Sequence, residues 1–225
     1  VNGCYGVLQN LYTSDYWAMA EMRADNTNYQ YNESDRGAQQ REEIDEFLIT
    51  PTNNYVNNTW AQLYRNIQQS NVIISRIDAV PFSDEATKQQ YLGEAKFLRA
   101  LYYFHLVRLF GGVPLLVKEV SSPEEAMTPK RATVDEVYAQ IIADATDAIA
   151  GLPATYSEAQ TGRATKGAAL TLLGDVYMTM KDFPKAVTTL QQVTTMNYSL
   201  VSNYADNFDP AKKNCAEMVN NYDWF

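Results

Sequence analysis

The segment between Ser83 and Gly112 constrains the fold of this chain most, because it is apolar around most of a helical turn. Its apolar residues recur every three or four positions, as expected for a helix. They form two stripes, Leu92, Ala95, Leu98, Tyr102, Leu106 and Leu109 in one, and Phe97, Leu101 and Phe104 in the other. A helix that is apolar on most sides has to be covered on most sides. The pattern therefore predicts a long central helix that ends at Gly111-Gly112.

Four further long segments show the helical period, at residues 60–80, 133–151, 165–180 and 182–193, and residues 3–13 carry a shorter helical stripe. Thr133 and Glu136 form a capping box at the start of the second segment. No convincing alternation of apolar and polar residues indicates a β-strand before about residue 215. These patterns predict an all-α chain.

The segment from Leu173 to Leu190 has the spacing of a tetratricopeptide unit. Leu173-Gly174 is followed by Tyr177, and the small residue Ala186 falls in the next helix. Small residues at Gly174 and Ala186 let two antiparallel helices approach closely. One such unit cannot bury its own apolar face, so further helix pairs must stack on it. The predicted fold is therefore a set of tetratricopeptide-like helix pairs, an alpha-alpha superhelix, with long irregular loops.

Residues 14–58 lose the helical period and are rich in Asn, Asp, Gln and Tyr. We expect a long loop here, with one short helix near residues 42–49. A loop of this length in a compact domain usually has a function or is disordered. Five aromatic residues argue against simple disorder, namely Tyr16, Trp17, Tyr29, Tyr31 and Tyr55.

Composition narrows the range of partners. The chain carries 18 Lys and Arg against 27 Asp and Glu, a formal charge of −9. Attraction to phosphate supplies most nucleic-acid affinity, so this charge argues against nucleic acid and against an anionic membrane surface. No uncharged apolar run approaches the roughly 20 residues of a membrane-spanning helix. Sixteen tyrosines and three tryptophans are common in surface binding proteins, whose flat rings stack on ligands.

Several segments together resemble one known family. The strongest is E-A-K-F-L-R-A-L-Y-Y-F at residues 94–104, followed by G-G-V-P-L at residues 111–115. Four more stand in the expected order: W-A-Q-L-Y-R-N-I at 60–67, R-A-T with E-V-Y at 131–138, G-R-A-T-K-G-A-A at 162–169, and F-D-P at 208–210. Over essentially its whole length, the chain resembles the SusD-like (RagB/SusD) nutrient-binding lipoproteins of Bacteroidetes outer membranes.

The resemblance implies tetratricopeptide-like helix pairs that support an irregular ligand-binding face. It also implies a non-catalytic protein that captures a glycan or similar oligomer and delivers it to a SusC-like TonB-dependent transporter. Family members are usually longer, so we expect residues 1–225 to be one helical domain, the N-terminal half of a protein, cut at both ends. We expect it on the extracellular side of the outer membrane, held by a lipid anchor upstream of Val1 rather than on Cys4.

The candidate ligand contacts are aromatic and amide side chains of residues 14–58. They are Trp17, Tyr29, Tyr31, Asn54, Tyr55 and Asn58. The C–H face of a sugar packs on a flat ring, and an amide can bond two neighbouring hydroxyls. The alternative, that several of these rings cover the helical core, stays open. Trp60 and Tyr64 lie at helical spacing and are expected in the core.

Other chemistries are poorly supported. His105 is the only histidine and lies on the central helix, where a core role is expected. With Cys4 and Cys215 as the two cysteines, neither a zinc site nor a Cys–His nucleophile is expected, and no cofactor is indicated. Whether these two cysteines pair is left open. The acids at residues 42–46 are expected on a solvated helix face.

Two rival functions stay open at this point. A tetratricopeptide scaffold that binds peptides would need a regular repeat, and the sequence shows one good unit. A glycoside hydrolase would need two carboxylates about 5–10 Å apart, and no credible pair is visible. A peptide as the captured ligand also fits the sequence.

Overall fold

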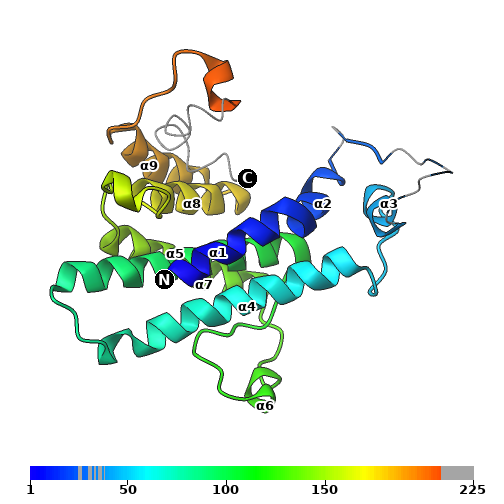
Figure 1. Ribbon diagram of the computed structural model, residues 1–225, viewed down its shortest axis with the longest axis horizontal. Helices are drawn as coiled ribbons and strands as arrows, with labels where there is room; N and C mark the ends of the chain where they lie inside the picture. Colours follow the sequence, from blue (N-terminus) through cyan, green and yellow to red (C-terminus); the bar gives the residue numbers. More distant parts are fainter. Residues whose placement is uncertain (25–26, 30–31, 33, 35–36, 38, 209–225) are drawn as a thin grey trace.

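The computed structural model describes residues 1–24, 27–29, 32, 34, 37 and 39–208. Over these residues the chain is helical, and the β-type contact is an isolated antiparallel bridge between Pro114 and Arg131. None of the described helices is both long and apolar enough to cross a membrane. The all-α prediction is confirmed (Figure 1).

The helices alternate with loops, and long irregular loops flank α6 and connect α7 to α8, as predicted. The first part of the chain forms α1 (Asn2–Asn10), the π-helical turn η1 (Leu11–Asp15), α2 (Tyr16–Glu21), α3 (Gln39–Asp45) and α4 (Asn54–Arg76). The rest forms α5 (Glu85–Phe110), α6 (Pro123–Ala126), α7 (Val134–Gly151), α8 (Lys166–Thr179) and α9 (Phe183–Thr194). Short 3₁₀ turns lie at Ile77–Ala79, Glu158–Gln160 and Tyr204–Phe208.

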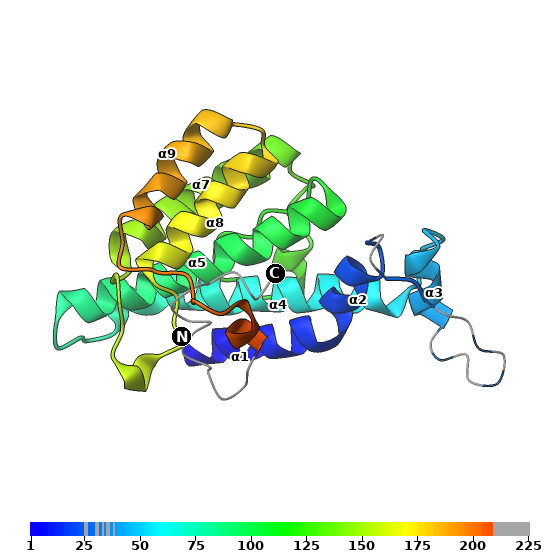
Figure 2. The same ribbon diagram turned by 90° about the horizontal axis from the view of Figure 1, so that it is seen from above.

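Helix α5 is the central helix that the sequence predicts. It packs chiefly against α7 and α4, while α8 packs against both α7 and α9 (Figures 1 and 2). Tyr102, Tyr103 and Phe104 on α5 are completely buried. Both tyrosine hydroxyls donate to backbone carbonyls, Tyr102 to Cys4 at 2.8 Å and Tyr103 to Leu116 at 3.0 Å. The apolar period read from the sequence therefore marks the core.

Helices α8 and α9 form the tetratricopeptide-like pair expected from the spacing. Gly174 on α8 faces Leu190 on α9, and a Cβ added at Gly174 would lie 2.3 Å from a methyl carbon of Leu190. Ala186 on α9 is 3% exposed. The two helices can therefore approach only because these positions carry small residues.

Residues 14–58 contain more helix than the sequence predicts, so the expectation of one long loop is wrong. Part of η1, all of α2 and α3, and the start of α4 lie in this segment, and α4 begins at Asn54 instead of Trp60. Asn53 starts α4, because its side-chain oxygen accepts hydrogen bonds from the backbone amides of Tyr55 (3.0 Å) and Val56 (3.4 Å).

The short length of these helices explains why the pattern missed α2 and placed the ends of α3 incorrectly. Leu11 is the buried residue of η1, Ala18 and Met19 those of α2, and Ile44 that of α3. One or two buried positions cannot establish a helical period, which needs a window of about 11–18 residues. The expected short helix near residues 42–49 is α3, which begins and ends earlier.

A buried ion pair joins α5 and α7, two of the three longest helices. Arg99 on α5 and Asp144 on α7 are 5% and 2% exposed. The guanidinium Nε and Nη2 donate to the two carboxylate oxygens at 2.8 Å and 2.6 Å. The remaining nitrogen, Nη1, donates to Oδ1 of Asn71 on α4 at 2.8 Å and to the carbonyl of Val117 at 2.9 Å. One side chain thus links α5, α7, α4 and the segment that follows α5.

We expect Asp144→Ala to lower the free energy of unfolding by about 3–5 kcal/mol, because it leaves the buried Arg99 cation without its carboxylate. Asp147→Ala is the matched control, since Asp147 joins Lys96 across the same two helices at 2.5 Å but its side chain is 56% exposed. The control should lose less than about 1 kcal/mol. Urea denaturation followed by circular dichroism measures both, and equal losses would contradict the argument.

Helix α4 also carries buried polar groups without partners. Among the described residues, side-chain atoms of this kind gather on one face of α4, at Thr59, Gln62, Asn66 and Gln69. Asn66 is the extreme case, because it is fully buried and neither its amide nitrogen nor its oxygen has a hydrogen bond. Asn71, one turn further on, is also fully buried, yet its amide nitrogen donates to two carbonyls at 2.7 Å and 2.9 Å.

The contrast predicts opposite effects for one substitution at two positions. Asn66→Leu should raise the free energy of unfolding by about 1–3 kcal/mol, since it removes an unsatisfied buried group. Asn71→Leu should lower the free energy of unfolding by a similar amount or more, because the Leu116 and Lys118 carbonyls and the Arg99 guanidinium would each lose a hydrogen-bond partner. Thermal unfolding of both variants tests this, and the idea fails if both move in the same direction.

Candidate ligand-binding site

The candidate ligand residues of α2 and α4 lie at one end of the molecule, where α2, α3 and the first turns of α4 meet (Figures 1 and 2). Ala18 and Met19 of α2 and Ile44 of α3 form a small buried apolar cluster, against which Tyr55 and Val56 of α4 pack. Asn53 adds a polar link to α3, since its amide nitrogen donates to the Gln40 carbonyl (2.9 Å) and to a Glu43 carboxylate oxygen (3.0 Å). This end is therefore a packed surface with defined outward positions.

Trp17 occupies one of these outward positions. It lies on α2 and is 43% exposed, whereas the next two residues, Ala18 and Met19, turn into the apolar cluster. A large ring on a helix anchored from its other side is suited to stacking on a ligand. Its place is consistent with the predicted role, which stays a prediction.

The three candidates on α4 differ from one another. Asn54 and Asn58 are exposed and four residues apart, so they share one face of the helix. Tyr55 is half-buried, and its hydroxyl accepts a hydrogen bond from Nε of Arg41 on α3 at 2.7 Å. Much of the Tyr55 side chain is therefore used to hold α3 against α4, and Asn54 and Asn58 are the freer pair.

The remaining sequence candidates are less available. Tyr29 is half-buried, and its backbone amide donates to the carboxylate of Asp45 at 2.9 Å. Tyr31 lies outside the described residues. Trp60 and Tyr64 pack on each other at 4.9 Å between ring centroids and lie against the main core, as predicted.

Phe47 is a prominent exposed ring at this end that the sequence reasoning missed. It follows α3 with a positive φ of 59° and is 64% exposed, and its neighbour Leu48 is 63% exposed. The Leu48 amide donates to the Glu43 carbonyl at 2.8 Å, which closes the turn that ends the helix. Arg23 lies over the Phe47 ring, 5.2 Å from its centroid. A left-handed conformation costs a residue with a side chain about 1–2 kcal/mol relative to its relaxed state.

A sequence signal for this feature does exist. Helix ends in this conformation usually carry Gly or Asn, and here Glu46-Phe47-Leu48 follows the acidic helix instead. Two bulky apolar residues at the place of a helix-ending glycine would have indicated an unusual turn.

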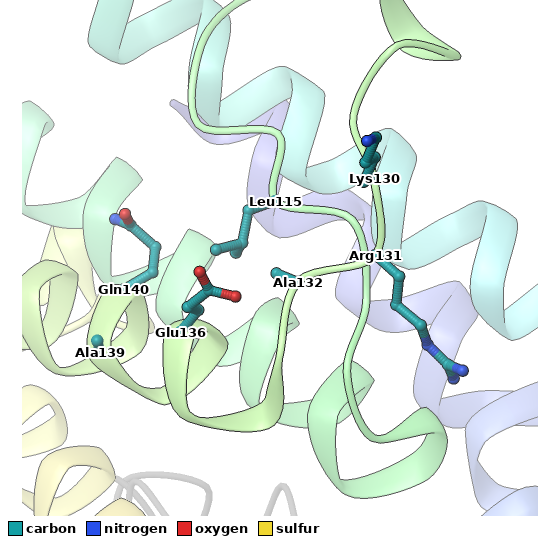
Figure 3. A pocket seen from close by; sticks show the side chains of 7 residues that line it. All are labelled: Leu115, Lys130, Arg131, Ala132, Glu136, Ala139 and Gln140. Carbon is teal, nitrogen blue, oxygen red and sulfur yellow. The ribbon is translucent and has the colours of Figure 1, made fainter.

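A pocket lies elsewhere, between α7 and the segment that leads to it (Figure 3). Its volume is about 610 Å³, with Leu115, Ala132 and Ala139 as its apolar lining. The Glu136 carboxylate at its edge accepts hydrogen bonds from the backbone amide and hydroxyl of Thr133 at 2.7 Å and 2.9 Å, which lower its pKa. The predicted capping box is thus confirmed.

This pocket offers little for a sugar. None of its lining side chains is aromatic, and the Arg131 guanidinium is turned to the backbone carbonyls of Gly112 (2.5 Å) and Phe110 (3.0 Å). Figure 3 shows the Arg131 side chain extending away from Leu115 and Glu136. None of the predicted ligand residues lines it.

His105 has the core position expected for it. It is fully buried on α5, with the Tyr12 hydroxyl 2.6 Å from Nε2 and Nη2 of Arg108 3.0 Å from Nδ1. Burial, and then the nearby Arg108 charge, hold its pKa well below the usual range. Because Arg108 can only donate, Nδ1 accepts and the neutral ring carries its proton on Nε2. His105 therefore joins η1 to α5.

Cys4 lies on α1 and is 3% exposed, and burial is the main cause that raises the pKa of its thiol. Cys215 lies outside the described residues. Within the described part of the chain, no group of three His, Cys, Asp or Glu side chains is placed to hold a metal ion.

Comparison with known proteins gives a consistent family. Residues 2–178 match the model of a SusD-like family described as "Starch-binding associating with outer membrane". SusD-like protein P38 of Formosa agariphila is 30% identical over 201 residues, which cover 88% of this chain and 38% of that protein.

Solved structures show the same likeness in three dimensions. A laminarin binding SusD-like protein superposes with a TM-score of 0.79 at 30% identity, over 92% of this chain and 48% of that one. A SusD-like protein from Bacteroides fragilis superposes with a TM-score of 0.78 at 28% identity, over 92% of this chain and 41% of that one. The chain spans less than half the length of each of these relatives. Given the family match over most of its length, the chain belongs to the SusD-like family of helical, tetratricopeptide-like proteins.

Proposed function

We propose that this protein binds a glycan at the cell surface, without catalysis, and delivers it to a SusC-like TonB-dependent transporter in the outer membrane. The observation that carries the proposal is the open surface of α2, α3 and α4, where exposed rings and amides gather within a SusD-like fold. The printed family description and the laminarin-binding relative support a polysaccharide as the ligand class.

The chemistry of this surface supports capture rather than reaction. Trp17 offers a flat apolar face, and Asn54 and Asn58 each offer both donors and acceptors for hydroxyl groups. The nearby carboxylates of Glu43 and Asp45 are engaged, the first by Asn53 and the second by the Tyr29 amide. Acids with such structural roles are poorly placed to act on a glycosidic bond.

The proposed location also includes a lipid anchor upstream of Val1. Cys4 is an unsuitable attachment point, because its thiol is buried on α1 against the core. We propose that the helical side away from α2 and α3 docks on the transporter.

Affinity electrophoresis through gels that contain laminarin or starch tests the proposal. At least one gel should retard the wild type, and that gel should retard the Trp17→Ala variant less, with binding weakened by roughly tenfold, equivalent to about 1.4 kcal/mol of lost stacking. Tyr204→Ala is a suitable control, because Tyr204 is 77% exposed and lies outside the candidate site.

Three outcomes would count against the proposal. Release of smaller sugars by the pure protein would contradict non-catalytic binding. Retardation by neither polysaccharide, together with binding to a peptide library, would favour the tetratricopeptide scaffold. Unchanged binding of Trp17→Ala would remove Trp17 from the site.

A further inference from the structure

We propose that Phe47 is a stacking platform for a neutral polysaccharide chain, with the polar side chains at the start of α4 as its hydrogen-bonding surroundings. The inference rests on the proposed function. It adds a contact residue that is not among the six candidates predicted from the sequence and that lies on a turn instead of a helix face.

Phe47 stands where the fold itself would prefer glycine. Its positive φ of 59° is favourable for glycine and strained for phenylalanine. The side chain gains little contact inside the protein, because it is 64% exposed. A ring held in a strained and exposed position indicates a contact outside the chain, as strained residues do at many binding sites.

The ring is held in place before any ligand arrives. The Arg23 guanidinium lies 5.2 Å from the ring centroid and can cover only one of its two faces. A ring restrained in this way loses less conformational freedom when a ligand packs on the other face.

The surroundings favour a neutral, hydroxyl-rich ligand. Three charged groups near the turn are engaged within the protein, Glu43 by Asn53, Asp45 by the Tyr29 amide and Arg41 by Tyr55. The two exposed charges beside the ring, Glu46 and Arg23, are of opposite sign, so the turn presents no net charge to a ligand. The exposed polar side chains that follow the turn are hydroxyls and amides: Thr50, Thr52, Asn54, Asn57 and Asn58. Such groups both donate and accept, as sugar hydroxyls do.

A protein partner fits this turn less well. Phe47 and Leu48 are its two large exposed apolar side chains. A stable protein interface buries about 800 Å² on each partner, with an apolar centre, which two side chains alone do not supply.

The test uses the whole protein in gels with a graded concentration of laminarin, starch or xylan. Phe47→Gly should weaken binding by roughly tenfold, the equivalent of one lost stacking contact. The same variant should unfold at a higher temperature than the wild type, because glycine relieves the strained turn. Phe47→Tyr should retain binding, since it keeps the ring.

Phe183→Ala is the matched control, because Phe183 is 60% exposed on α9, at a distance from α3 in both views (Figures 1 and 2). It should bind as the wild type does. Normal binding by Phe47→Gly would overturn the inference and leave the proposed function standing, and a lower unfolding temperature would overturn the strain argument. If none of the three polysaccharides retards the wild type, the proposed function fails and this inference fails with it.

Discussion

The buried pair of Arg99 and Asp144 is the interaction on which the rest of the structure depends. A guanidinium in the core must have its donors satisfied, because water is absent and an unpaired buried charge is severely destabilising. Here the partners come from α7, from α4 and from the backbone after α5. Satisfying one cation therefore sets the mutual positions of three long helices. It also explains why a polar residue occurs in the middle of the most apolar segment.

The position of α4 then determines the geometry of the candidate site. Its middle is held against α5 through Asn71, while its first turns project with Asn54 and Asn58 outward. The turn η1, which comes before α2, is bonded to both α4 and α5. Gln62 of α4 donates to the Asp15 carboxylate at 2.5 Å, and the Tyr12 hydroxyl lies 2.6 Å from Nε2 of His105 on α5. A π-helical turn changes the direction of the following residues relative to a continuous α-helix. The outward position of Trp17 thus follows from contacts made along α4 and α5.

Features that depend on local periodicity or on helix-end chemistry could be predicted. The central helix, the capping box of Thr133 and Glu136, the close approach at Gly174 and the core position of His105 are all confirmed. In residues 14–58, α3 was predicted with shifted ends and α2 was missed, because each buries one or two residues and is stabilised by neighbours far away in the chain. The site was predictable as a region, and less so residue by residue. Tyr55 is hydrogen-bonded by Arg41, and the exposed Phe47 is not among the ligand residues predicted from the sequence.

The sequence by itself determined that this chain is all-α, that residues 83–112 form its centre, and that its segments resemble those of SusD-like proteins. These properties follow from the spacing of apolar residues and from short motifs, which can be recognised without knowing the distant contacts. Only the tertiary structure decided which rings and amides at the α2–α4 end face outward. That choice depends on how α2, α3 and α4 share one small apolar cluster, and on a backbone turn that holds Phe47 in a left-handed conformation. The exposure of a side chain depends on how the whole chain packs around it, so a local sequence pattern could not predict it.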